Sequence, residues 1–389
     1  MSRPIHVPSP GGAPAWLVHR PGAAVTTVSV WLRAGSRHEG PGTAGGTHLL
    51  EHVLMQAPLA GGERVVDLLE ELGGEANAIT GREHLALYAR VPTEEAGRAL
   101  AVLGRALAEP DLSADVLEAE RKVVREELRL AGSDPLDIVH DVFFELAYPG
   151  HPLGRPVGGT LDEVDALELD ALRAHHRRFL GSAGVVVCGG ADPDDLMRTL
   201  DKGPLASLPA WRPSPQAPPV WRGGRQTLRL NSDTAGVVIG GECGDSPAWP
   251  VLMELLAGAS SALLTEELRN SLGLCYELWA VAAPYRDAGA WRVFLATAPE
   301  HVDEVVERAT ELLAEPRWTT AQVRRAAGRA AALMRLEAEQ SLEEALLYGK
   351  HALVPGVPGW TLPAELAAIG SVAEVPSPKG PFAVAICCQ

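Results

Sequence analysis

The chain has 389 residues, of which 46% are hydrophobic and 22% are charged, and its formal net charge is −16. This length suits two domains of ordinary size, and the composition argues against an intrinsically disordered chain. An acidic protein repels phosphate groups, so we expect neither nucleic acid nor a membrane as a partner. The charge either lines a cavity that attracts basic peptides or keeps the surface soluble.

The elements of the first half follow from apolar periodicity and turn residues. A β-type run at 25–35 precedes a helical segment at 47–55, and a second strand is expected at 84–91. A long helical segment at 114–130 follows, before a buried strand at 183–190. Strands mixed with amphipathic helices predict an α+β domain, in which an antiparallel-rich mixed sheet packs against helices.

The second half repeats these elements after a segment, residues 204–224, that is rich in proline and tryptophan and is predicted to be a linker. A β-type run at 234–244 again precedes a helical segment, and further strands are expected at 290–297 and 381–388. We therefore expect two structurally similar domains that arose by internal duplication.

The tetrapeptide Leu-Ala-Glu-Pro marks the repeat most clearly. It occurs at 107–110 and again at 313–316, between two helical segments in each half. Together with the upstream strand and helix, it aligns the two copies in the same order. The predicted division is an N-terminal domain of residues 1–203, the linker 204–224, and a C-terminal domain of residues 225–389.

The cysteines and the first residues bear on the cellular compartment. The chain has five cysteines, and no pair shows metal or redox spacing, which favours a reduced, cytoplasmic protein. The N-terminal residues contain no apolar segment of a signal peptide, and no stretch reaches the roughly 18 apolar residues of a membrane span. The cysteines are Cys188, Cys243, Cys275, Cys387 and Cys388.

The sharpest local pattern is His-Leu-Leu-Glu-His, with His48, Glu51 and His52. Histidines at positions i and i+4 share one face of a helix, so both imidazoles can bind one metal ion. Glu51 lies one position before the second histidine, where a carboxylate can act as a general base on water. Taken alone, the pattern also suits a helix with two ordinary histidines.

A catalytic zinc site usually has three protein ligands. The helical segment 114–130 offers Glu120 and Glu127, which lie two turns apart beside its apolar side. Carboxylates on a buried side need a partner, and a cation would serve, although acids at the flank of an amphipathic helix are the alternative. The apolar side is expected to comprise Val116, Leu117, Val123, Val124 and Leu128.

The repeat gives an independent argument for a shared ion. Positions that hold apolar residues in the second copy are expected to face a core, whereas the first copy places three polar groups at the aligned positions. One metal ion explains all three changes together. The aligned pairs are His48 with Val251, His52 with Leu255, and Glu127 with Leu333.

These motifs together resemble the pitrilysin-type (insulinase-like) peptidases, whose zinc motif is the inverted His-x-x-Glu-His. The similarity extends over nearly the whole chain and is closest to the short two-domain form, such as mitochondrial processing peptidase subunits and small bacterial relatives. It departs at residues 55–60 and after Ile369, where the chain is short and proline-rich. The segments that carry the resemblance are 35–39, 73–88, 118–128, 151–160 and 258–278.

The resemblance implies a zinc-dependent endopeptidase that cleaves extended peptides. It implies one Zn²⁺ per chain, with Glu51 as the base and Glu120 as a second catalytic acid that orients a ligand or the water. Substrate is expected to bind the strand edge at 77–78 and the Arg/Tyr pair of a metal-free C-terminal domain. The implied metal ligands are His48, His52 and Glu127, and the implied substrate-binding residues are Asn77, Ala78, Arg269 and Tyr276.

The resemblance also bears on assembly. We expect a homodimer in which each zinc site is completed in trans by the partner's C-terminal domain. Two alternatives stay open. The chain could be one subunit of a heterodimeric processing peptidase that removes leader peptides, or a non-catalytic scaffold that binds peptides.

Overall fold

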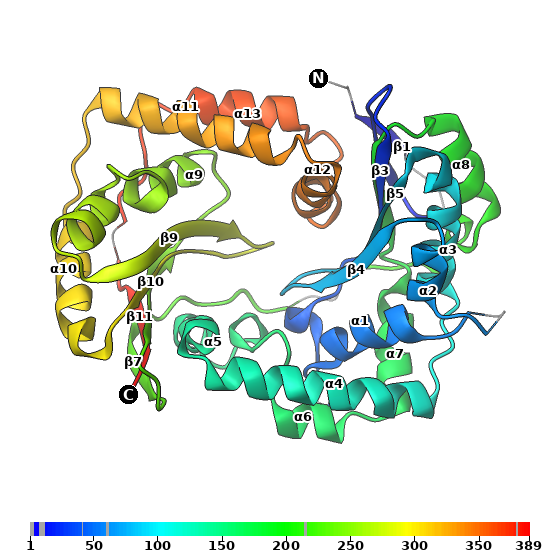
Figure 1. The fold of residues 1–389 in the computed structure, drawn as a ribbon, viewed down its shortest axis with the longest axis horizontal. Helices are drawn as coiled ribbons and strands as arrows, with labels where there is room; N and C mark the ends of the chain where they lie inside the picture. Colours follow the sequence, from blue (N-terminus) through cyan, green and yellow to red (C-terminus); the bar gives the residue numbers. More distant parts are fainter. Residues whose placement is uncertain (1–3, 8–11, 41, 60–61, 214–215, 379) are drawn as a thin grey trace. The chain divides into compact units, whose positions relative to one another are not determined.

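The computed structural model describes residues 4–7, 12–40, 42–59, 62–213, 216–378 and 380–389. Contacts divide the chain into two compact units, each built from three segments (Figure 1). Unit 1 comprises Met1–Leu128, Val157–Pro215 and Leu336–Pro363, and unit 2 comprises Arg129–Pro156, Gln216–Arg335 and Ala364–Gln389.

Unit 1 is built on a six-stranded sheet in the order β1-β2-β6-β3-β5-β4. The β2–β6 pair is parallel and all other neighbours are antiparallel. Strand β4 stands at the end of this order and pairs with β5 alone among the described strands. The strands are β1 (Ile5–Val7), β2 (Ala15–His19), β3 (Val25–Leu32), β4 (Glu75–Thr80), β5 (Leu85–Pro92) and β6 (Gly184–Gly189).

Helices cover both faces of this sheet. In the central strand β3, Val28 and Val30 join the core formed with α1 and α3, whereas Thr27 and Trp31 point to the opposite face and contact the segment around α12. Because both faces are covered, β3 is buried along almost its whole length. The helices are α1 (Gly46–Gln56), α2 (Val65–Glu70), α3 (Ala96–Ala108), α4 (Ala114–Ser133), α6 (Leu161–Ala166), α7 (Leu169–Leu180), α8 (Pro193–Lys202) and α12 (Ser341–Tyr348).

Unit 2 repeats this architecture with a five-stranded sheet in the order β7-β11-β8-β10-β9. This order matches β2-β6-β3-β5-β4 of unit 1, including a single parallel pair, β7–β11. The prediction of two similar mixed-sheet domains related by duplication is therefore confirmed. The strands are β7 (Gly224–Arg229), β8 (Ala235–Glu242), β9 (Cys275–Pro284), β10 (Gly289–Thr297) and β11 (Ala383–Cys388).

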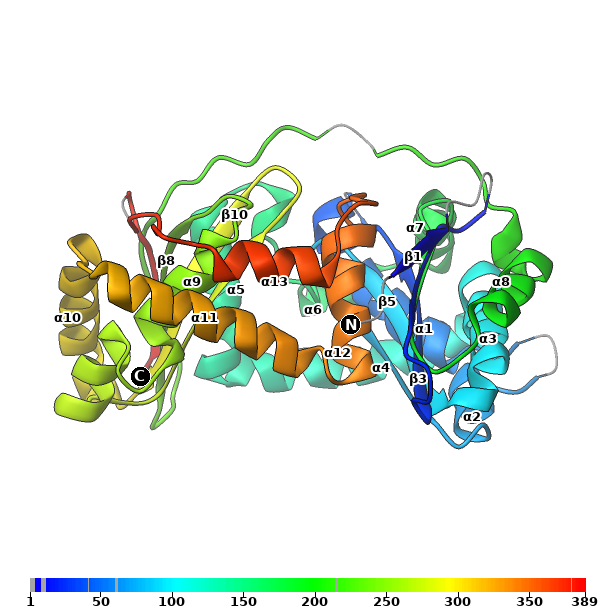
Figure 2. The ribbon, with the colours of Figure 1, turned by 90° about the horizontal axis from the view of Figure 1, so that it is seen from above.

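The helices of unit 2 form two layers around its sheet. Helix α5 packs on β7, β8 and β11, and α10 packs on β8. Figure 2 shows α13 alongside α11, where Ile369 and Ala330 share one apolar cluster with Val251. The helices are α5 (Pro135–Ala147), α9 (Ala248–Met253), α10 (Val302–Ala314), α11 (Thr320–Glu337) and α13 (Leu362–Gly370), with π-helical segments at Glu254–Gly258 and Thr265–Ser271.

The two halves exchange one helix each. Helix α5 follows α4 in the first half yet belongs to unit 2, and α12 follows α11 in the second half yet belongs to unit 1. The compact units are therefore not contiguous in sequence, and the division at residues 204–224 stays a prediction about the repeat. Both halves of the predicted linker make contacts. Trp211 packs on the core of unit 1, and Trp221 Nε1 donates a hydrogen bond to Pro381 O at 2.7 Å within unit 2.

The contact between Gly349 and Trp31 yields a stability prediction. Gly349 follows α12 and is buried against the Trp31 ring, so a Cβ added there would overlap the ring. We expect Gly349→Ala to lower the free energy of unfolding by about 1–3 kcal/mol, as overpacking does. The matched control is Gly328→Ala on α11, where no atom lies within 4 Å of the new Cβ. Denaturant unfolding should show the control unchanged or stabilised by up to about 1 kcal/mol.

Candidate metal centre

The first turn of α1, which carries His48, is held by a buried carboxylate. Glu39 accepts hydrogen bonds from the Gly45 N–H at 2.9 Å and the Thr47 N–H at 2.7 Å. These N–H groups have no partner within the helix, and a negative group at a helix N-terminus is favoured by the helix dipole. The Thr47 hydroxyl also contacts His175 Nε2 of α7 at 3.0 Å. The start of the histidine helix is thus fixed on two sides.

A buried arginine anchors helix α4 to the end of α6. The Arg121 guanidinium donates to Leu167 O at 2.6 Å and to Val164 O. Val124 is buried one turn further on, which confirms one apolar face of this helix. Val123 is exposed, so its predicted place on that face is wrong: a single step along a helix turns a side chain by about 100°.

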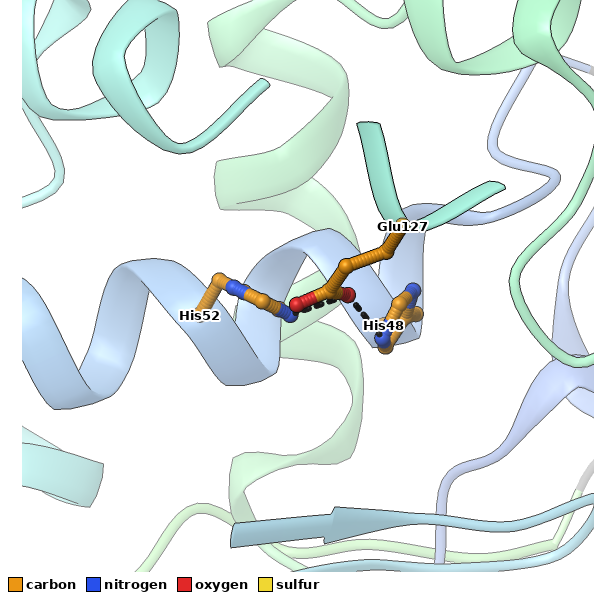
Figure 3. A group of neighbouring side chains, drawn as sticks. All are labelled: His48, His52 and Glu127. Carbon is orange, nitrogen blue, oxygen red and sulfur yellow. Dashed lines mark ion pairs between the residues drawn. The ribbon is translucent and has the colours of Figure 1, made fainter. Parts of the chain in front are cut away.

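Three predicted ligands meet between α1 and α4 (Figure 3). Glu127 Oε2 lies 3.3 Å from His52 Nε2 and 3.6 Å from His48 Nε2, and the three ligand atoms lie within 4.8 Å of one another. The Glu127 side chain is 48% exposed, whereas the Glu120 side chain is 13% exposed and its Oε2 lies 3.5 Å from His52 Nδ1. The site is therefore open on the Glu127 side and closed on the Glu120 side.

The two histidine–carboxylate separations suit a tetrahedral zinc ion. With ligand distances of about 2.0–2.2 Å, tetrahedral ligand atoms are separated by roughly 3.4 Å, close to both observed histidine–carboxylate distances. Two imidazoles and one carboxylate leave a fourth position for water. Burial, and then the neighbouring His52, lowers the pKa of His48 to about 4, so its ring is neutral and can bind a metal. Among the residues that the structure describes, none is hydrogen-bonded to its buried Nδ1.

Glu51 points toward the sheet and contacts strand β4. Its Oε2 accepts a hydrogen bond from the Thr80 hydroxyl at the end of β4. Burial raises the pKa of Glu51 above its usual value, while the Thr80 hydrogen bond and His52 act in the opposite direction. A carboxylate that is partly desolvated and held by one donor is suited to accepting and returning a proton.

The predicted substrate-binding residues lie in both units. Asn77 and Ala78 are on β4, the edge strand, where the Ala78 N–H donates to Asn77 Oδ1 at 2.8 Å. Arg269 lies in the π-helical segment of unit 2 and Tyr276 at the start of β9, and both are exposed. Binding of substrate by these four residues stays a prediction.

The structure supports the repeat argument at two of the three aligned positions of the second copy. Val251 and Leu255 are buried in an apolar cluster, as expected. Leu333 is 36% exposed, so the expectation that it faces a core is wrong. Its first-copy counterpart, Glu127, is also half-exposed, which shows that this position points to an open side in both copies.

Two residues that contribute to the site were not predicted from the sequence. Glu39 and Thr80 bear no metal-ligand or base pattern, and their roles depend on which backbone or side-chain atoms they meet in space. The acidic residue before a glycine-rich helix start could have indicated a capping role for Glu39. The second copy retains Glu254 at the position of Glu51, where it pairs with Arg329 of α11.

No helix in the described parts of the chain is long and apolar enough to cross a bilayer.

Two repeated α+β units, with a His-x-x-Glu-His helix and a glutamate from a second helix, define the class of inverted-motif metallopeptidase folds. Residues 15–161 match the profile of the insulinase family (peptidase family M16), and residues 166–317 match the profile of the M16 inactive domain. The chain belongs to the M16 peptidase family.

Relatives in two bacteria bear this out. The chain is 31% identical over 320 residues to an uncharacterized zinc protease of Mycobacterium leprae, which covers 78% of this chain and 72% of that protein. It is 30% identical over 345 residues to an uncharacterized zinc protease of Streptomyces coelicolor, covering 82% and 74%.

Solved structures share the fold. A protease from Helicobacter pylori superposes with a TM-score of 0.85 at 18% identity and covers 100% of both chains. An M16-like peptidase from Alicyclobacillus acidocaldarius gives a TM-score of 0.77 at 17% identity, covering 100% of this chain and 99% of that one. The two-unit architecture is therefore that of M16 peptidases.

Proposed function

We propose that the protein is a zinc-dependent endopeptidase that cleaves extended peptides. The observation that carries this proposal is the convergence of two histidines of α1 with a glutamate of α4, and Glu51 lies on the same helix as the histidines. The relatives that are named zinc proteases support it. The proposed ligands are His48, His52 and Glu127, which would hold one Zn²⁺ per chain.

A zinc ion bound there would polarise a peptide carbonyl and make a bound water more acidic. Glu51 accepts the proton of the attacking water and delivers it to the leaving amine. The Oε2 atom of Glu51 accepts the hydrogen bond from the Thr80 hydroxyl, so we assign the transferred proton to Oε1. Glu120 orients the His52 ring through Nδ1.

The substrate is proposed to bind as an added strand at the edge of β4. Main-chain hydrogen bonds would hold an extended peptide there independently of its sequence. Asn77 and Ala78 are proposed to supply these contacts, with the peptide replacing Asn77 Oδ1 as the acceptor of the Ala78 N–H. Arg269 holds a peptide carbonyl or carboxylate, and Tyr276 donates to the carbonyl oxygen as charge develops on it. The net charge of −16 favours basic peptides.

Binding by strand addition predicts a strong preference for unfolded substrates. A small disulfide-stabilised protein should be cut when it is reduced and alkylated, and should resist cleavage when it is oxidised and folded, because only the unfolded chain can supply an extended strand. Mass spectrometry of the fragments measures this. Equal cleavage of both forms would contradict strand addition, and the Glu51→Gln variant serves as the blank.

We also propose a homodimer in which Arg269 and Tyr276 of one subunit complete the zinc site of the other. An equal mixture of His48→Ala and Tyr276→Phe chains should then regain about one quarter of the wild-type rate, since half of the randomly mixed dimers contain one complete site of two. The control is a mixture of His48→Ala and Glu51→Gln chains, which share a defective half and should stay inactive. Equal activity of both mixtures, or none after subunit exchange, would contradict the model.

Two alternatives are weaker. A subunit of a heterodimeric processing peptidase would depend on a second chain, yet this chain carries both the proposed ligands and the Arg/Tyr pair. A non-catalytic scaffold has no need for a histidine pair and a glutamate held within 4.8 Å of one another. A cytoplasmic location remains part of the proposal, supported by five free cysteines.

A further inference from the structure

Thr80 joins two parts of the proposed site that the sequence separates by 29 residues. It is the last residue of β4, the edge strand, and its hydroxyl donates to Glu51 Oε2 on α1. The side chain is half-buried, and α1 packs directly on β4. A single hydroxyl therefore connects the strand on which a peptide is proposed to bind with the carboxylate proposed to act on water.

The contact restrains Glu51 strongly. A glutamate side chain has three rotatable bonds, and the hydrogen bond to Thr80 restricts the arrangements that they can take. In the described part of the chain, the Thr80 hydroxyl is the only hydrogen-bond donor assigned to this carboxylate. A threonine at the end of a strand is itself stiff, because its branched Cβ restricts χ1. Glu51 is thus held by a rigid partner rather than by a flexible one.

We propose that Thr80 is a positioning residue that fixes the Glu51 carboxylate relative to a peptide bound along β4. This inference rests on the proposed function. Ala78, whose N–H is occupied by Asn77 Oδ1, lies two residues before Thr80 on the same strand. Because Thr80 and the proposed peptide-binding residues lie on one strand, β4 supports both the bound peptide and the Glu51 carboxylate. Thr80 acts through Glu51 and does not itself touch the reacting atoms.

The proposal predicts a loss in kcat without a matching loss in peptide binding. Thr80→Val keeps the shape of the side chain and removes the hydroxyl, so kcat should fall at least about tenfold while KM changes less than about twofold. Thr80→Ser restores the donor and should recover kcat to within about threefold of wild type. Zinc content should be the same in all three proteins.

A binding measurement separates positioning from a structural role. In the inactive Glu51→Gln background, Thr80→Val should leave the Kd of a fluorescent unfolded peptide unchanged within about twofold. If Thr80→Val is poorly folded, Thr80→Ala and Thr80→Ser provide the same comparison with a smaller side chain.

The inference is overturned if the hydroxyl-free variant keeps the wild-type kcat, or if peptide binding weakens as much as kcat falls. It is also overturned if Thr80→Ser is as impaired as Thr80→Val. A wild-type protein that cleaves no peptide would instead contradict the proposed function, so the two failures are distinguishable.

Discussion

Replacing Glu51 with glutamine is expected to reduce peptide cleavage by about 10²–10⁴-fold, the usual contribution of a general base. The amide has nearly the same shape as the carboxylate but cannot accept the proton of the attacking water. Its oxygen can still accept the Thr80 hydrogen bond, so the local structure should persist. Cleavage of an unfolded peptide under saturating conditions measures the effect.

The expected signature is loss of rate with retention of metal. Glu51 is not among the three groups whose ligand atoms converge, so Glu51→Gln should hold as much zinc as wild type. Glu70→Gln, an exposed change at the end of α2, is the matched control and should leave both quantities unchanged. A Glu51→Gln protein that cleaves at the wild-type rate would remove Glu51 from the mechanism.

The second large effect concerns zinc affinity. Glu127→Ala removes one of three proposed ligands and should weaken zinc binding by more than about 100-fold, because loss of an outer partner alone costs about 10–100-fold. Glu120→Ala removes such an outer partner, which contacts His52 Nδ1, and should show that smaller effect. Competition with a fluorescent zinc chelator measures both.

Comparing the two losses of zinc affinity shows which glutamate is the metal ligand and which is its neighbour. Both glutamates lie on α4, so a general disturbance of that helix would affect them alike. Glu126→Ala, an exposed change on the same helix, should leave zinc affinity unchanged. If Glu120→Ala weakens zinc binding more than Glu127→Ala, the assignment of the third ligand is wrong.

Much of the fold was accessible from the sequence because each strand and helix carries its own periodicity. Strands predicted at 84–91 and 290–297 correspond to β5 and β10 within one residue at each end. The placement of α5 in unit 2 and of α12 in unit 1 could not be predicted from the sequence. The apolar face of α5 specifies that the helix is buried, but not which of two similar sheets buries it.

In the candidate site, too, local features could be predicted from the sequence, whereas contacts between elements could not. Histidine spacing on one helix is a local property, and it placed His48 and His52 on one face. Helical periodicity offered Glu120 and Glu127 together, and the choice of Glu127 as the ligand came from the repeat and the family resemblance. The Thr80–Glu51 contact depends on how β4 packs against α1, and no spacing rule links residues in different elements.

Titration of the metal-free protein with zinc tests the central claim most directly. After chelation, the cleavage rate of an unfolded peptide should be negligible, and it should rise with added zinc to a plateau at about one equivalent per chain. Wild-type protein that cleaves equally well without zinc, or that binds no zinc, would contradict the assignment of the site formed by His48, His52 and Glu127.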